Sequence, residues 1–164
     1  MYKLNVNNRK IETEIVSKKI SELNNIFDKV ILLGFDYTLK YVGFNNADRT
    51  ITINDNVLSE KIIKYDDIVR VELIINGRTS MSMSNVIGGA ILAGETGAII
   101  GAMNKKEITT SKFIKFSLND FNNPSYEIDL LNTGKTLGVD INLNSEIEKL
   151  MDTIKFIINN KQTI

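Results

Sequence analysis

The residues of this sequence that could do chemistry are almost all carboxylates. The chain contains no histidine and no cysteine, which excludes thiol nucleophiles, disulfide frameworks, His-based metal sites and triads that need an imidazole. Asp36 and the adjacent pair Asp66 and Asp67 remain as candidates, and a hard divalent cation takes oxygen ligands of this kind. A metal-dependent carboxylate enzyme is therefore one hypothesis. A turn or helix-cap role suits Asp66 and Asp67 better, because neighbours in a strand point to opposite faces.

Two short strings resemble phosphate-handling motifs, and each lacks a residue that the chemistry requires. Segment 33–39 resembles the catalytic loop of haloacid-dehalogenase-type phosphatases, but Gly34 stands where the loop needs its nucleophilic aspartate. Segment 134–136 resembles the end of a phosphate-binding loop, yet Asp129 occupies the position of a required glycine. Neither string supports catalysis, so no catalytic residue, cofactor or metal is expected and the chain is predicted not to be an enzyme.

The segment 86–103 departs from the rest of the chain in composition. It holds five of the ten glycines and a single charged residue, Glu95. On a helix its small residues would form two adjacent rows with a four-residue period, and such rows let another helix approach closely. The first row is Gly89, Ala93, Gly97 and Gly101, and the second is Ala90, Gly94, Ala98 and Ala102. These eight residues are the predicted interaction site.

The form of this segment is left open by the sequence. One helix of this length would measure about 27 Å, barely enough to cross a bilayer, and an acidic residue at mid-span opposes insertion. A turn at 94–97 would instead produce a short hairpin, and an insertion packed within the domain is a third possibility. The expected partners are a second copy, another protein or a membrane surface. A net charge of zero argues against nucleic acid.

The surrounding pattern predicts a mainly β domain between two helices. Apolar residues at helical spacing predict a helix over 11–27, and a clearer stripe predicts a last helix that begins near Ser145, with Glu148 completing a capping box. Short apolar runs separated by Asn, Asp and Gly predict an antiparallel meander. The predicted strands are 30–33, 37–44, 50–53, 57–65, 69–75, 113–118 and 126–131.

This pattern divides the chain into two parts. We expect an N-terminal extension with its amphipathic helix over 1–35, followed by a domain over 36–160 that the segment 86–103 interrupts. The first residues are polar and lack the apolar stretch of a secretory signal. Cytoplasmic residence is therefore expected, with peripheral membrane contact as the alternative. A third hypothesis is a small membrane protein inserted by 86–103.

The order of these features resembles that of a known family. A strand over 64–72 leads into the polar stretch 76–85, and the Gly/Ala-rich segment follows. Lys105-Lys106, two further strands and a final helix complete the order. It is similar to pleckstrin-homology-like (PH-like) domain proteins of Gram-positive bacteria and their phages, over residues of about 40 to 160.

The resemblance implies an α+β fold and a non-enzymatic binding or assembly role. The fold would be mainly β, a bent antiparallel sheet or partly open barrel capped by the C-terminal helix, and this chain adds a helical N-terminal extension. PH domains often bind phosphoinositides through basic loops near the first hairpin. Here that loop is 45–49, where Asp48 stands beside Arg49, so phosphoinositide recognition is not expected.

Overall fold

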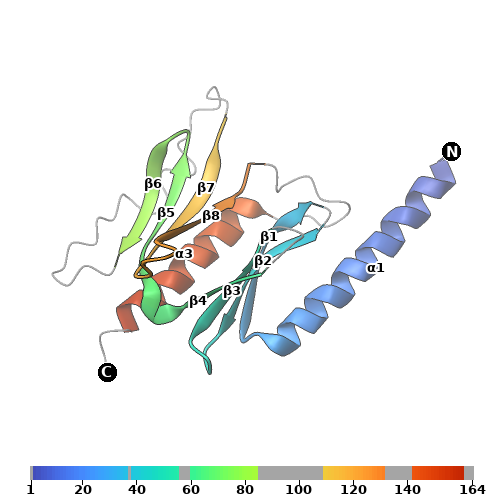
Figure 1. Ribbon diagram of the computed structural model, residues 1–164. Helices are drawn as coiled ribbons and strands as arrows, with labels where there is room; N and C mark the ends of the chain where they lie inside the picture. Colours follow the sequence, from blue (N-terminus) through green and yellow to red (C-terminus); the bar gives the residue numbers. More distant parts are fainter. Residues whose placement is uncertain (1, 37, 56–59, 85–108, 132–141, 161–164) are drawn as a thin grey trace.

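The structure is a computed structural model, and it describes residues 2–36, 38–55, 60–84, 109–131 and 142–160 (Figure 1). The Gly/Ala-rich segment 86–103 lies outside the described residues. The eight residues of its two small-residue rows therefore stay a prediction.

In the part of the chain that the structure describes, eight strands form two antiparallel sheets of four. The first sheet has the order β1-β2-β3-β4, formed by β1 (Lys29–Asp36), β2 (Thr38–Asn45), β3 (Thr50–Asn54) and β4 (Lys61–Lys64). The second has the order β6-β5-β7-β8, formed by β5 (Ile68–Ile75), β6 (Arg78–Ser84), β7 (Lys112–Leu118) and β8 (Ser125–Asp129). The 3-10 turn η1 (Tyr65–Asp67) connects the sheets. Among the described residues no strand pairing joins the two sheets, so they do not close into a barrel.

The described residues also form two helices, α1 (Tyr2–Ile26) and α3 (Leu143–Asn160). Helix α3 contacts β1, β5 and β6 and so covers the opening between the two sheets (Figure 1). Helix α1 runs along the outer side of β1 and β2, and its N-terminal end extends away from the sheets (Figure 1). The expected fold is confirmed: it is mainly β and PH-like, with a capping C-terminal helix and an N-terminal helix.

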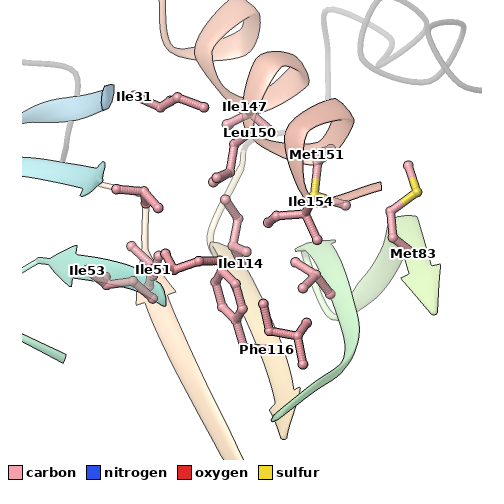
Figure 2. Close-up of a cluster of buried hydrophobic side chains, with 14 of the residues drawn as sticks. Ile31, Ile51, Ile53, Met83, Ile114, Phe116, Ile147, Leu150, Met151 and Ile154 are labelled. Atoms are coloured by element: carbon pink, nitrogen blue, oxygen red, sulfur yellow. The ribbon is translucent and has the colours of Figure 1, made fainter. Parts of the chain in front are cut away.

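The main core lies between the two sheets and α3. The six apolar residues that define the stripe of the last helix are all buried, namely Ile147, Leu150, Met151, Ile154, Ile157 and Ile158. They belong to the same cluster as alternate residues of both sheets, among them Ile31, Ile51, Ile53, Met83, Ile114 and Phe116. Figure 2 shows these side chains converging from the helix and from both sheets. One helix face therefore closes the core of the whole domain.

A second, smaller cluster lies on the outer face of the first sheet. Four residues of α1 and its C-terminal end contribute to it, namely Val16, Ile20, Leu23 and Phe27, and they pack with Val30, Leu32, Leu39 and Tyr41 of β1 and β2. Phe27 lies so close to Gly43 that a Cβ atom added there would be 2.7 Å from its ring. Glycine at position 43 thus permits the close approach of α1 to β2.

Several element boundaries differ from the sequence prediction, and those of α1, α3 and β1 matter most for the fold. Helix α1 starts at Tyr2 and not at residue 11. Helix α3 starts at Leu143, and its cap is Asn142, whose side-chain oxygen accepts a bond from the Ser145 amide at 3.3 Å. The capping-box prediction with Ser145 as the cap was therefore wrong. Strand β1 pairs with β2 from Lys29 to Asp36 with one register shift between Leu32 and Gly34, so residues 29–35 of the predicted extension contribute to the first sheet.

Strand β6 is absent from the sequence prediction, which treated 76–85 only as a polar stretch. It pairs with β5 in a hairpin that turns at Asn76 and Gly77. Both residues have positive φ angles, 50° and 74°, as the two central residues of a type I′ turn require. The Asn76 side chain also accepts bonds from the amides of Thr110 and Ser111, which fixes the entry to β7 beside this turn.

Candidate functional site

The three carboxylates named as catalytic candidates do not form one site. Asp66 pairs with the Arg49 guanidinium at 3.0 Å, as a structural turn residue would. Asp36 ends β1 opposite Thr38, while Arg49 follows the other end of β2, about 23 Å away along the strand. Within the ranges that the structure describes, no group of three acidic side chains is placed to hold a metal ion. The geometry therefore offers nothing in support of the carboxylate-enzyme hypothesis.

The basic residues that flank the Gly/Ala-rich segment in sequence are partly engaged in ion pairs. Lys115 pairs with Glu127 across β7 and β8 at 3.5 Å, and Arg70 approaches Glu72 at 3.9 Å. Exposed pairs of this kind contribute little stability, but they neutralise the surface. Both pairs lie on the second sheet, so this part of its surface carries charges of both signs.

The structure instead reveals a groove that the sequence did not indicate. It has a volume of about 340 Å³ and lies between the second half of α3 and the end of the first sheet. Its eight lining residues are Lys29, Phe44, Asn46, Tyr65, Asp152, Thr153, Phe156 and Ile157; we call this the α3 groove. Cavities of this size are large enough for a small ligand or an inserted side chain.

The base of the α3 groove is apolar, and its rim combines polar residues with one exposed aromatic ring. Phe44, Tyr65 and Ile157 line it and are 2%, 5% and 7% exposed, whereas Phe156 at the rim is 69% exposed. A large aromatic side chain left in water beside a buried apolar base is typical of a surface that binds an apolar group.

Lys29 is held at the rim of the groove by a short chain of hydrogen bonds. Its ammonium group donates to the Thr153 hydroxyl at 2.7 Å. That hydroxyl in turn donates to the backbone carbonyl of Lys149 at 2.6 Å. This arrangement places a positive charge beside α3, at the residue of β1 that pairs with Phe44 of β2. Asp152 supplies a negative charge on the same rim, and among the described residues it has no hydrogen-bond or ion-pair partner.

Tyr65 connects the groove with the turn between β2 and β3. Its hydroxyl donates to the Asn46 side chain at 3.1 Å, and the Arg49 guanidinium lies over its ring, 5.9 Å from the centroid. Burial raises the pKa of Tyr65, and the negative charge of Asp28 raises it further, while Arg49 acts in the opposite direction. The phenol is therefore protonated at neutral pH. The hydrogen-bonded side chains of Tyr65 and Asn46 therefore form one polar wall of the groove, and such a wall is suited to binding a ligand.

The sequence analysis did not predict this groove because its residues come from β1, the end of β2 with the turn that follows it, η1 and α3. One local signal was available. Phe156 lies in the last helix but outside its apolar stripe, and a large aromatic residue on the solvent face of an amphipathic helix has no role in the core. That signal could have marked α3 as a contact surface.

The fold defines a PH-like domain: two antiparallel sheets, a core between them and a C-terminal helix over the opening. Comparison with protein families agrees with this. Residues 29–132 match the family described as glycine zipper containing PH domain, and the chain belongs to that family. The match contains all eight strands and the segment 86–103.

Two curated relatives match over 110 residues with 26% identity, which covers 61% of this chain. One is named an immunity protein of Bacillus phage SPbeta, and 55% of its length is covered. The other is an SPbeta prophage-derived membrane protein, YomJ, of Bacillus subtilis, covered over 48%. The chain thus spans about half the length of the curated relatives it matches. No solved structure matches it.

One of these relatives is named a membrane protein, so the length and hydrophobicity of the helices in this chain are of interest. Neither α1 nor α3 contains a stretch long and apolar enough to cross a bilayer, and no other helix does so within the described residues.

Proposed function

We propose that this chain is a non-enzymatic interaction module and that the segment 86–103 is its main contact element. The observation that carries the proposal is the family match, which spans both sheets together with a segment rich in Gly and Ala. The PH-like domain would hold this segment between β6 and β7 and present it to a partner.

The physical basis is the spacing of the small residues. Gly97 and Gly101 belong to one four-residue row, and Gly94 and Ala98 belong to the other. Rows of this kind allow two backbones to pack closely, which increases van der Waals contact across the interface. The favoured partner is therefore a helix with small residues of its own, from another protein or from a second copy.

The remaining observations favour binding over catalysis. The chain has no histidine or cysteine, and Asp36 lies far from the adjacent pair Asp66 and Asp67. One matched relative is named an immunity protein, and that name supports a role in which this chain also acts by binding.

The test is to replace Gly97 and Gly101 together with Leu and to measure binding and assembly. Two added side chains in one row would prevent close backbone contact, so partner capture and any assembly through this segment should be lost. Thermal unfolding of the variant should stay within a few degrees of the wild type. A matched control replaces Ile91 and Ile99 with Leu, which preserves volume. Unchanged binding in the glycine variant would contradict the proposal.

A membrane surface is the second candidate, and one observation favours it: a matched relative is named a membrane protein. In this case the wild-type chain should pellet with vesicles that contain phosphatidylglycerol, and a Glu95→Lys variant should pellet more strongly. If vesicles retain no protein at low ionic strength, the membrane form of the proposal fails while the protein-binding form stands.

A further inference from the structure

A second exposed apolar feature, the side chain of Phe121, lies on the same side of the domain as the α3 groove. Phe121, in the connection between β7 and β8, is 100% exposed. The amide of Asn119 in that connection donates to the Asp67 carbonyl of η1 at 2.7 Å, and Tyr65 of the same turn lines the groove. The connection, η1 and the C-terminal part of α3 therefore lie on the same side of the domain (Figure 1).

The loop that carries Phe121 is held in a fixed conformation. One carboxylate oxygen of Asp120 accepts bonds from the amides of Asn122 and Asn123 at 2.9 and 3.2 Å. The other oxygen accepts a bond from the Asn123 side chain at 3.3 Å. The amide of Leu118 also donates to the Pro124 carbonyl at 2.8 Å and closes the base of the loop. A preordered aromatic side chain loses little conformational entropy on binding.

Phe121 and the α3 groove each have charged residues nearby, and the two sets of charges are complementary. Asp120 is adjacent to Phe121. Hydrogen bonds from Asn122 and Asn123 lower the pKa of its carboxyl, and the charge of Lys61 lowers it slightly further, so Lys61 lies within electrostatic range of Asp120. The rim of the groove carries Lys29 and Asp152. Asp120 beside the exposed ring, with Lys61 within its electrostatic range, is thus complementary in charge to Lys29 and Asp152 at the groove.

We infer that two copies of this chain associate about a two-fold axis, with Phe121 of each copy inserted into the α3 groove of the other. Asp120 then faces Lys29 of the second copy, and Lys61 faces Asp152. A two-fold axis is the simplest symmetry because the inserting loop and the groove share one side of the domain, so both contacts form at once and the assembly closes. The zero net charge of the chain removes long-range repulsion between copies.

The inference concerns a surface other than the one in the proposed function, since none of its residues lies in 86–103. The two can therefore be separated by experiment. Sedimentation velocity of the full chain, over a concentration series of about 1–100 µM, gives the dissociation constant of the dimer. The wild type is expected to dimerise in this range, and a wild type that stays monomeric throughout overturns the inference.

Phe121→Ser is the first variant. Two buried rings are lost from each dimer, so we expect dimerisation to weaken by at least about a hundredfold. Ile15→Ser is the matched control, because Ile15 is 63% exposed and lies on α1, on the outer side of the first sheet and away from the groove. It should leave the dimer constant unchanged. Equal effects of the two variants would overturn the inference, since they would indicate non-specific association.

A charge exchange tests the orientation of the two copies. Asp152→Lys alone should weaken dimerisation about tenfold by placing two cations together. Lys61→Glu alone should act similarly, and the double variant should recover most of the loss because the pair is reversed. Additive losses in the double variant overturn the proposed pairing.

The glycine variant then separates this interface from the Gly/Ala-rich segment. Replacing Gly97 and Gly101 with Leu should leave the dimer constant unchanged if the groove forms the interface. Loss of the dimer in the glycine variant, together with its persistence in Phe121→Ser, would overturn the inference and support self-association through 86–103.

Discussion

The two faces of the first sheet are covered by helices of different character. On the inner face, α3 contributes six buried side chains to a core shared with both sheets. On the outer face, α1 contributes two buried side chains, Val16 and Leu23, to a separate cluster with β1 and β2. Helix α3 therefore completes the domain, while α1 adds a layer to a sheet that is already closed from the other side.

The family match does not distinguish α3, which completes the core, from α1, which adds an outer layer. It covers 29–132 and leaves out both α1 and α3. Because the six α3 residues are buried in the main core, the cooperative folding unit must extend to the end of α3. The same argument does not apply to α1, whose contacts lie outside that core.

The largest expected effect comes from Leu150→Ala in α3. Leu150 is fully buried, so the substitution should lower the free energy of unfolding by about 3 kcal/mol. Urea denaturation would measure it, and hydrogen exchange should accelerate in both sheets together. Glu148→Ala, on the exposed side of the same helix, is the control and should change stability by less than about 0.5 kcal/mol. Exchange that accelerates only in α3 would contradict the shared core.

The same difference between α1 and α3 determines how much of each helix could be predicted from the sequence. The stripe of α3 repeats over its full length, and every residue named from its spacing is buried. In α1 the spacing indicated a helix, but the sequence could not show that it would pack on the outer face of β1 and β2, because that placement depends on Gly43 accommodating Phe27.

The second sheet shows a similar limit. Strand β6 alternates Ser with the buried residues Met81 and Met83, and neither type favours strands as Val or Ile does. The Asn76-Gly77 pair was the usable signal, since this dipeptide is a strong indicator of a hairpin. The α3 groove had no comparable signal, because it exists only after four separate segments have come together.

Leu23→Ala tests the outer layer and should have a smaller effect. Leu23 is 2% exposed, but the surrounding cluster is small and can relax, so we expect a loss of about 2 kcal/mol. Hydrogen exchange should accelerate in α1 while the amides of β5 and β7 keep their protection. Ile26→Ala on the same helix is the control, because Ile26 is 63% exposed. Uniform acceleration across both sheets would place α1 in the main cooperative unit.

Gly43→Ala sharpens the comparison at a single contact. The added methyl group would lie 2.7 Å from the Phe27 ring, so the ring must move, at a cost of about 1 to 2 kcal/mol. Combined with Phe27→Ala, which removes the ring, the same glycine substitution should cost much less. A double-mutant cycle of urea denaturation measures this coupling. Strictly additive losses would show that Gly43 is required for another reason.

The smallest effect concerns one hydrogen bond between the two sheets. The Tyr126 hydroxyl of β8 donates to the Asp55 carboxylate after β3 at 2.8 Å. Burial raises the pKa of Tyr126, and the bond to Asp55 and its charge raise it further. The folded state therefore holds the phenol proton more tightly than the unfolded chain does. The resulting stabilisation is complete below the unfolded pKa of about 10 and decreases as the pH rises through the folded value.

Tyr126→Phe removes this contact and should lower stability by about 1 kcal/mol at pH 8. The difference from the wild type should then shrink between about pH 10 and pH 12, because the wild type loses the same contribution on ionisation. Tyr41→Phe is the parallel variant on the outer face, where burial and Glu60 likewise raise the pKa of Tyr41. Urea denaturation across this pH range gives both difference curves. A Tyr126 difference that stays constant would mean that the phenol ionises equally in both states, and the bond to Asp55 would then contribute nothing to joining the sheets.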